Sequence, residues 1–237
     1  MGKNLIQQAR GKGSPTYRAP SFKYKGSVKH SKDLKDLKGK IIDIVKCRGH
    51  SAPLAQVLYE NGEETYMVAP EGIRVGDIIS SGVDSPAELG NTSTLRNIPE
   101  GTLIYNIESF PGDGGKFIRA SGGFGKVLSK IDDNVVVMLP SKKQRTFNAN
   151  CRACIGVVAC GGRKEKPFLK AGRRFYAMKA KNKLYPHVCG ISMNAVDHPF
   201  GGSCSHSKGR PTQSSRNSPP GRKVGKIAPK RTGRKKR

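Results

Sequence analysis

Leu54-Ala-Gln-Val-Leu-Tyr59, the turn Glu60-Asn-Gly-Glu63 and the following Glu64-Thr-Tyr-Met-Val-Ala69 form the stretch that decides the fold. Two runs rich in apolar and β-branched side chains flank Asn61 and Gly62, which both accept the positive φ of a tight hairpin turn. The stretch therefore predicts two antiparallel strands, and a protein whose core is built from β-sheet.

Similar short runs lie on both sides of this hairpin. None has the 3.6-residue period of an amphipathic helix, so each predicts a strand, and closely spaced short strands indicate small closed barrels. A short helix is expected only near residues 173–180. The expected strands outside the hairpin cover residues 40–46, 77–82, 102–108, 116–120, 126–131, 134–139, 145–149 and 155–159.

The charge of the chain points to a polyanionic partner. It has 44 Lys and Arg against 17 Asp and Glu, for a formal net charge of +27. Residues 41–140 hold 8 basic and 13 acidic residues, whereas residues 199–237 hold 12 basic residues and no acidic one. A mildly acidic centre between basic ends is the layout expected of a globular core that docks on RNA with its extensions.

A polybasic membrane-surface protein is the competing interpretation of this charge. It requires an amphipathic helix or a lipid anchor beside the basic residues, and the sequence shows neither. No apolar run approaches the roughly 20 residues that cross a bilayer, and the N-terminal residues lack the apolar segment of a signal peptide. We therefore expect a cytoplasmic protein with no membrane partner.

Both ends of the chain predict extensions without a core of their own. From Pro199 onward Lys and Arg recur among Gly, Pro and Ser, so this segment cannot offset its ordering entropy and should take shape only on a polyanion. In the N-terminal segment Tyr17, Phe22 and Tyr24 are suited to stacking on bases, and the Lys and Arg residues around them to phosphate contacts. The alternative is a pair of solvated tails.

Several motifs, in order along the chain, carry a family resemblance. They are residues 95–102 (Leu-Arg-Asn-Ile-Pro-Glu-Gly-Thr), 150–156 (Asn-Cys-Arg-Ala-Cys-Ile-Gly), 170–174, 188–202 (Val-Cys-Gly-Ile-Ser-Met-Asn-Ala-Val-Asp-His-Pro-Phe-Gly-Gly), 219–228 and 231–234. With these motifs the chain closely resembles the universal large-subunit ribosomal protein family L-two, in its archaeal and eukaryotic form. The resemblance covers nearly the whole chain.

The resemblance implies an all-β core in which an oligonucleotide-binding-type (OB) barrel precedes an SH3-like barrel. It implies a structural, non-enzymatic constituent of the large ribosomal subunit: a primary rRNA-binding protein that supports subunit assembly, subunit association and the architecture around the peptidyl transferase centre. Its expected partners are large-subunit rRNA, neighbouring ribosomal proteins and the small subunit at the intersubunit face. The expected domains are a basic N-terminal extension (1–36), the OB-type barrel (37–83), a connector (84–98), the SH3-like barrel (99–170) and a basic C-terminal extension (171–237) that carries the His-Pro-Phe-Gly-Gly loop.

His198 is the most conspicuous single candidate for chemistry. In the family the matching His lies in the loop directed toward the peptidyl transferase centre and has been proposed to assist peptide-bond formation. Acid–base work needs a positioned partner, and only Asp197 is adjacent, so we interpret His198 as an RNA-contacting, loop-organising residue.

The resemblance also assigns Arg152 to RNA binding, while His50 stands where relatives commonly carry Arg. The predicted RNA-binding set combines basic side chains with the loop around His198. It comprises Arg18, Lys23, Arg96, Arg152, Arg173, Arg174, Asn194, Asp197, His198, Gly201, Gly202, Lys208, Arg210, Arg222, Lys223, Arg231 and Arg234.

The six cysteines predict either reduced thiols or a zinc site, because a disulfide framework is not expected inside the cell. Two sets of side chains have spacings that suit zinc. One is Cys151, Cys154 and Cys160, and the other, on both sides of the His198 loop, is His187, Cys189, Cys204 and His206. The sequence leaves both sets open, and no cofactor is certain.

Two further function classes stand as alternatives. A Cys-His hydrolase would need a low-pKa thiol in a pocket that excludes water, and a Gly-rich basic tail is a poor place for one. A free RNA chaperone or RNA-binding regulator outside the ribosome would show the same electrostatics as a ribosomal protein. Sedimentation with large subunits at high salt distinguishes a ribosomal protein from such a free chaperone, because an integral component stays bound.

Overall fold

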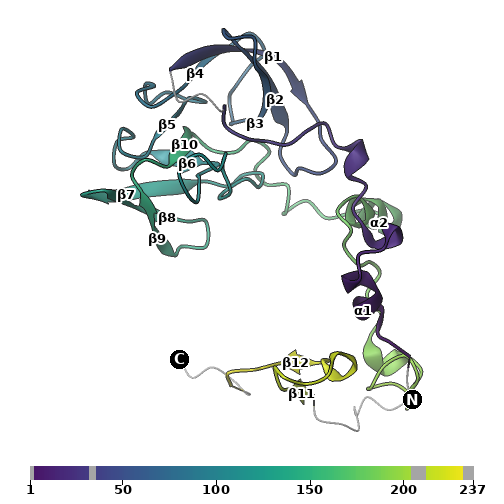
Figure 1. Cartoon of the computed structure of the whole chain (residues 1–237). Helices are drawn as coiled ribbons and strands as arrows, with labels where there is room; N and C mark the ends of the chain where they lie inside the picture. Colours follow the sequence, from purple (N-terminus) through teal and green to yellow (C-terminus); the bar gives the residue numbers. More distant parts are fainter. Residues whose placement is uncertain (1–2, 32–35, 204–211, 232–237) are drawn as a thin grey trace. The chain divides into compact units, whose positions relative to one another are not determined.

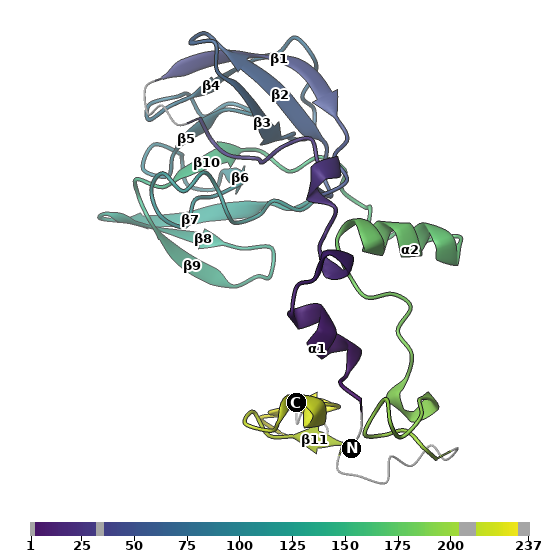
Figure 2. The same cartoon turned by 45° about the vertical axis from the view of Figure 1, so that its right-hand side comes forward.

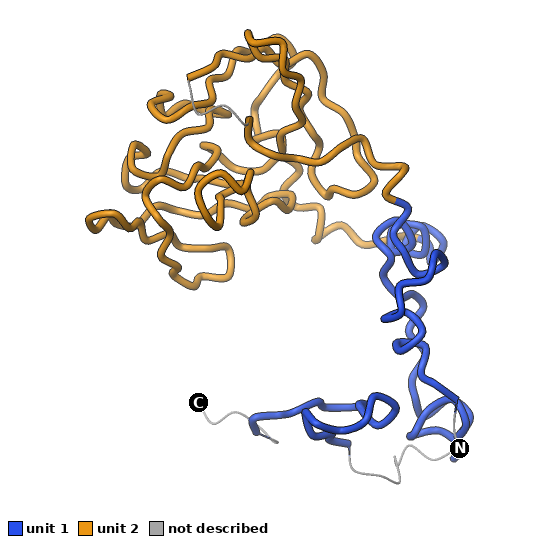
Figure 3. The backbone as a smooth tube through the Cα atoms, viewed as in Figure 1, with its two compact units in different colours: residues 1–20, 170–237 blue, residues 21–169 orange. Residues whose placement is uncertain are grey.

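The computed structural model describes residues 3–31, 36–203 and 212–231. The chain divides into two compact units, Ser21–Leu169 and Met1–Pro20 together with Lys170–Arg237 (Figure 3). We call the first the barrel unit and the second the extension unit. Strands form most of the regular structure of the barrel unit, whereas turns and short helices dominate the described part of the extension unit.

Ten strands of the barrel unit form one curved sheet in the order β3-β2-β1-β4-β5-β10-β6-β7-β8-β9 (Figure 1). The expected hairpin is confirmed, because β2 and β3 pair antiparallel around the Asn61-Gly62 turn, from Leu54 opposite Val68 to Leu58 opposite Glu64. The strands are β1 (Leu37–Val45), β2 (Leu54–Tyr59), β3 (Glu64–Val68), β4 (Ile78–Ser81), β5 (Thr92–Thr94), β6 (Leu103–Tyr105), β7 (Gly125–Ile131), β8 (Asn134–Met138), β9 (Gln144–Asn148) and β10 (Arg152–Ile155).

Two apolar cores lie against this sheet. Buried side chains of β1 to β4 form the first core, which also receives Tyr105, Cys154 and Val158 from later in the chain. The second core lies under β6 to β10 and includes Ile104, Phe147 and other side chains that are at most 5% exposed. Burial of one such large apolar side chain contributes about 1.5–3 kcal/mol. The expectation of an all-β core is confirmed.

Strand β10 joins the two halves of the sheet. It is the last strand of the barrel unit in sequence, yet it lies between β5 and β6 and pairs antiparallel with both. All four of its residues are buried. The expected connector at 84–98 was wrong in one respect, because it contains β5, whose buried Thr-Ser-Thr side chains give no apolar alternation that would predict a strand.

Two other strand expectations need correction. Residues 116–120 form only a single bridge, between Phe117 and Ile107, because Ile118 has a φ of 56° and interrupts extended backbone. The strand expected at 155–159 lies earlier, at Arg152–Ile155. The apolar pattern did not reveal it because an arginine occupies a buried position.

Residues 21–31 pack on the barrels and do not belong to the extension unit. Val28, His30 and Ser31 are each at most 7% exposed, and Val28 forms a parallel bridge to Tyr66 at the edge of β3. The expected N-terminal extension (1–36) is therefore divided in the structure, and only its first 20 residues cluster with the C-terminal part of the chain.

In the residues that the structure describes, the extension unit contains two short helices, α1 (Ile6–Gly11) and α2 (Ala171–Ala180) (Figure 2), and a two-stranded parallel pair. Helix α2 lies where a helix was expected, and neither helix has a buried residue. Arg10 of α1 donates to the carbonyl oxygen of Asn182, just after α2, at 2.5 Å. The parallel strands are β11 (Gln213–Ser214) and β12 (Lys226–Ile227), and the 3₁₀ turns of this unit are Pro15–Tyr17, Gly190–Ser192 and Pro220–Arg222.

Candidate nucleic-acid interface

The loop from Met193 to Gly202 is closed by its own backbone. The carbonyl oxygen of Asn194 accepts the amide N–H groups of Asp197 (3.0 Å) and His198 (3.1 Å), and the N–H of Gly202 donates to the carbonyl of Met193 (3.1 Å). These bonds replace a hydrophobic core, of which the loop has little, and they give it a defined shape.

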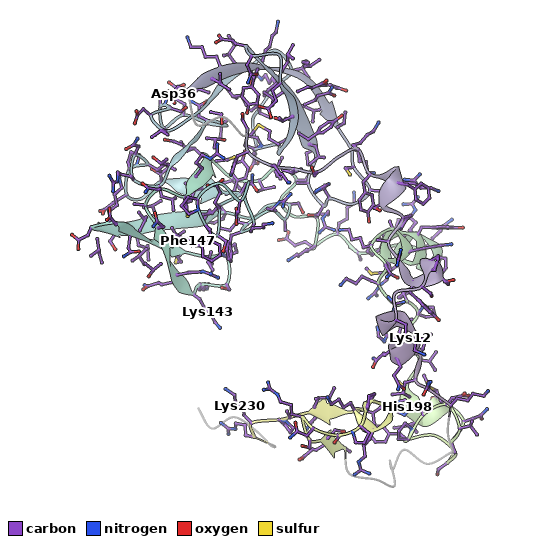
Figure 4. All side chains as sticks on the ribbon, viewed as in Figure 1. Lys12, Asp36, Lys143, Phe147, His198 and Lys230 are labelled. Carbon is purple, nitrogen blue, oxygen red and sulfur yellow. The ribbon has the colours of Figure 1, made fainter. Side chains whose placement is uncertain are left out.

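His198, labelled in Figure 4, makes contacts within this loop. Its Nδ1 accepts the amide N–H of Phe200 at 3.0 Å, and the two rings lie 5.2 Å apart between centroids. The imidazole also lies so close to Gly190 that any side chain there would overlap it. Partial burial lowers the pKa of His198, so the neutral form dominates near pH 7, and its proton sits on Nε2 because Nδ1 is an acceptor.

The N-terminus reaches the same loop. The amide N–H of Lys3 donates to the carbonyl of Val196 at 2.8 Å, and the Lys3 ammonium lies 3.7 Å from the Asp197 carboxylate. Both side chains are well exposed, so the ion pair contributes little energy. Its effect is to occupy Asp197, the only acidic neighbour that His198 has in sequence.

Cations in both units lie beside aromatic rings. In the extension unit the Arg174 guanidinium lies 5.0 Å from the Tyr185 ring centre and that of Arg10 lies 5.6 Å from Tyr17. In the barrel unit the Lys23 ammonium lies 5.4 Å from the ring of Phe22, which is 83% exposed. Phe22 is exposed and Tyr17 and Tyr185 are half-buried, and a ring that is accessible beside a cation suits base stacking next to a phosphate.

The predicted RNA-binding residues are divided between the two units. Those of the barrel unit are Lys23, Arg96 and Arg152, and the other described members belong to the extension unit. Arg96 is exposed but paired with Asp133 at 2.5 Å. Lys208, Arg210 and Arg234 lie outside the described residues. The exposed members are Arg18, Lys23, Arg96, Arg173, Arg174, Asn194, Gly202, Arg222 and Arg231, and Asp197, His198, Gly201 and Lys223 are half-buried.

Arg152 is the member of the set that the structure places elsewhere. Its side chain is 3% exposed and its guanidinium Nη2 lies 3.2 Å from the Glu108 carboxylate, which is fully buried. Nη1 donates to the carbonyl of Ser31 at 2.8 Å. RNA contact by Arg152 stays a prediction, and in this structure its guanidinium lies below the surface, where it neutralises a buried carboxylate.

Glu108 organises the loop that follows β6. Its carboxylate accepts the amide N–H groups of Gly112 (3.1 Å), Gly114 (3.1 Å) and Arg152 (2.9 Å). His30 lies in the same buried polar group, with Nε2 2.8 Å from the carbonyl of Asn106. Burial is the main cause that lowers the pKa of His30 to about 4, and Arg152 adds to it, whereas Glu108 opposes it.

The cysteine set Cys151, Cys154 and Cys160 does not form a metal site. Cys151 is buried in the second core and Cys154 in the first, since residues three apart along extended backbone face opposite sides. Burial raises the pKa of both thiols, that of Cys151 to about 11. Among the residues that the structure describes, no three His, Cys, Asp or Glu side chains are placed to hold a metal ion. The second set includes Cys204 and His206, which lie outside the described residues.

Sequence reasoning did not single out Lys116 and Arg119. Both belong to the loop after β6 and face a cleft shared with Tyr24, Lys29 and His50. A signal for them existed in the Gly-rich run at 112–115 beside two basic residues. None of the helices in the described ranges is long and apolar enough to cross a bilayer.

A body of two β-barrels, with exposed cations and aromatic rings on turn-rich extensions, defines a class of basic β-barrel proteins suited to polyanions. Residues 6–81 match the model of "Ribosomal Proteins L2, RNA binding N-terminal domain", and residues 88–220 match "Ribosomal Proteins L2, C-terminal domain". The chain belongs to the ribosomal protein L2 family, and the recognition made from its motifs is confirmed. Its barrels are accordingly an OB-type barrel and an SH3-like barrel.

Curated relatives agree with this over the full length. The chain is 53% identical to the large ribosomal subunit protein uL2 of Archaeoglobus fulgidus over 235 residues, which cover 98% of this chain and 99% of the relative. It is 51% identical to uL2 of Methanococcoides burtonii over 237 residues, 99% of this chain and 100% of the relative. With uL2 of Methanothermobacter thermautotrophicus it shares 48% identity over 241 residues, with complete coverage of both chains.

Proposed function

We propose that this chain is a structural constituent of the large ribosomal subunit and binds its rRNA. The full-length relationship to uL2 proteins carries this conclusion. The surface supports it, because Arg173, Lys179 and Arg222 are exposed and have no acidic partner among the described residues. Unpaired cations on extensions without a core are suited to the phosphate backbone of a folded RNA.

Binding is driven by release of the counterions that surround the RNA. Each phosphate neutralised by Lys or Arg releases condensed cations, so affinity falls as salt rises. The barrels act as the rigid body, and the extensions, which have two helices without a buried residue, order against the RNA. The ordering entropy of these segments is offset by the contacts that they make.

The role that we propose for His198 is contact and not chemistry. Its Nδ1 is used within the loop, which leaves Nε2–H as a donor to a phosphate or base acceptor. Asp197 faces Lys3, and no second titratable group in the described loop is positioned to pass a proton. We propose that the protein is not an enzyme and that His198 and Asn194 present the loop to rRNA near the peptidyl transferase centre.

The wider partners follow from this placement. We propose contacts with neighbouring ribosomal proteins and with the small subunit at the intersubunit face, and support of subunit assembly in the cytoplasm. The single free-standing alternative is an RNA chaperone or regulator outside the ribosome, which would use the same cations.

Binding to large-subunit rRNA fragments across a salt series tests the proposal. If about ten phosphates are contacted, log affinity against log salt should fall with a slope near −7 to −9. A flat salt response would contradict the mechanism. Sedimentation with large subunits through a high-salt gradient then separates a ribosomal component, which stays bound, from a free chaperone, which is released.

A further inference from the structure

A cleft of about 490 Å³ opens on the barrel unit, where three segments meet. Its walls come from residues 21–29 before β1, the turn between β1 and β2, and the loop that follows β6. A volume of this size falls in the range of small-ligand sites. The side chains that matter for its chemistry are Tyr24, Lys29, His50, Lys116 and Arg119.

Buried contacts fix the walls of this cleft. Val28 is 2% exposed, and its carbonyl accepts the Nη2–H of Arg119 at 3.0 Å. The Nη1 of Arg119 donates to the carbonyl of Gly115 at 3.2 Å, and the amide of His30 donates to the carbonyl of Gly114 at 3.2 Å. The segment before β1 is thereby held against the loop after β6, so the cleft is preformed.

The cleft is cationic. Lys29 and Lys116 are exposed, and neither has an acidic partner among the described residues. Asp113 also lines the cleft, but its two carboxylate oxygens accept the amide N–H groups of Ser109 (3.0 Å) and Gly115 (2.9 Å). The acidic group is therefore engaged in its own turn, and the two lysines set the charge offered to a ligand.

Two rings line the same cleft. Tyr24 packs against Gly49 so closely that a Cβ at Gly49 would lie 2.7 Å from the ring carbon Cδ2. This contact holds the phenol ring in place, and His50 follows directly in the chain. A flat, fixed ring and cations without an acidic partner line one cleft, so a single ligand that enters it can meet both a stacking surface and a phosphate contact.

We propose that this cleft binds a single unpaired nucleotide of the RNA, with its phosphate at Lys29 and Lys116 and its base against Tyr24 and His50. The inference rests on the proposed RNA-binding function and assigns it a defined subsite on the barrel unit. A flipped or bulged nucleotide is the chemical class that combines one negative group with an exposed aromatic face. The extensions then contact continuous backbone, while the cleft recognises a break in base pairing.

Photocrosslinking locates the subsite directly. The full chain is bound to large-subunit rRNA fragments that carry 4-thiouridine, irradiated, digested and analysed by mass spectrometry. We expect crosslinked peptides that contain Tyr24 or His50 in addition to peptides from the extension unit. Free 4-thiouridine monophosphate serves as the second ligand, and a crosslink in the cleft from this mononucleotide alone would overturn the assignment to RNA.

Matched variants separate charge from stacking. Lys29→Gln with Lys116→Gln should reduce the magnitude of the salt slope by about 1, because one phosphate contact is lost. Lys38→Gln with Lys143→Gln removes the same charge from strand β1 and the β8–β9 turn, and should leave the slope nearly unchanged. Tyr24→Leu should weaken binding about tenfold at an unchanged slope, whereas Tyr24→Phe keeps the ring and should bind normally.

The outcomes distinguish the cleft from the proposed function. Crosslinks confined to the extension unit, with equal slopes for both lysine pairs, would refute the cleft and leave rRNA binding intact. If the chain without substitutions did not bind rRNA at all, this result would instead refute the proposed function. A thermal unfolding curve for each variant verifies that the barrels are folded, and the crosslinks together with the Lys29/Lys116 pair keep the test valid if Tyr24→Leu unfolds.

Discussion

The barrel unit and the extension unit are ordered by different forces. The barrel unit has two clusters of buried apolar side chains beneath a continuous sheet. In the described part of the extension unit, only Leu5, Phe200 and Ser214 are buried. Exclusion of water stabilises the first, whereas the second depends on backbone hydrogen bonds within turns and, in our proposal, on neutralised phosphates. In this proposal one chain joins a body with apolar cores of its own to segments that a partner orders.

Removal of residues 199–237 should have the largest effect, and it tests whether RNA binding and folding belong to different units. The segment holds 12 basic residues and no acidic one. We expect rRNA affinity at physiological salt to fall by on the order of 10³-fold or more, because many phosphate contacts are lost. Circular dichroism and thermal unfolding should show that the barrel unit is still folded. Unfolded barrels would show that the barrel unit depends on this segment. Unchanged affinity would show that the segment does not carry the RNA binding.

Arg152→Met breaks the buried ion pair of the barrel unit. It leaves the Glu108 carboxylate without its cation at a fully buried position, so the free energy of unfolding should fall by about 3–5 kcal/mol. Chemical denaturation measures the change. Arg96→Met is the matched control, because the Arg96–Asp133 pair is exposed and should contribute less than about 1 kcal/mol. Equal effects of the two substitutions would contradict the buried role of Arg152.

Acid should destabilise the barrel unit through His30. The unfolded imidazole takes up a proton below pH 6.5, whereas burial delays this in the folded protein to about pH 4. Between these values the unfolded state holds more protons, so stability is complete above pH 6.5 and declines by about 3 kcal/mol toward pH 4. His30→Gln should flatten the decline in a pH series of unfolding curves. The groups around His30, namely Glu108, Asp113, Arg152 and Cys154, are unchanged in this variant.

Gly190→Ala tests a single contact of the extension unit, the one between Gly190 and His198. A methyl group there would overlap the His198 imidazole, so the loop should shift while the barrel unit keeps its melting temperature. We expect rRNA affinity to fall about three- to tenfold, an effect of about 1 kcal/mol. Gly172→Ala in α2 is the control, since a methyl group there has no atom within 4 Å and should leave affinity unchanged. An unaffected Gly190→Ala protein would show that the packing of His198 does not matter.

The sequence predicted what depends on apolar pattern and turn chemistry. The hairpin at Asn61-Gly62, a core built from short strands and helix α2 follow from local signals, and the structure confirms them. The pair of barrels, OB-type and SH3-like, was implied by the family resemblance, which the family match confirms. The sequence did not predict β5 or the true position of β10, because each contains polar residues whose burial is compensated by partners far away in the chain. Arg152 shows the reason: its partner Glu108 stands 44 positions earlier in the sequence, and only the fold brings the two side chains together.

The candidate site divides in the same way. The basic composition of the chain predicted exposed cations such as Arg173 and Arg222, and a sequence motif predicted the loop from Met193 to Gly202. The cleft of Lys29 and Lys116 is not, because its walls come from segments that meet only after the barrels have formed. Which basic residues converge is a property of tertiary structure, whereas how many there are is a property of sequence.

The late position of β10 governs the order in which this protein can mature during its own synthesis. The hairpin of the first barrel emerges early, but its core awaits Tyr105, Cys154 and Val158, and the sheet has a gap until residue 155 has been made. A nascent chain that stops at residue 83 would therefore display an unfinished apolar surface. Such long-range closure slows folding and leaves that surface open to chaperones.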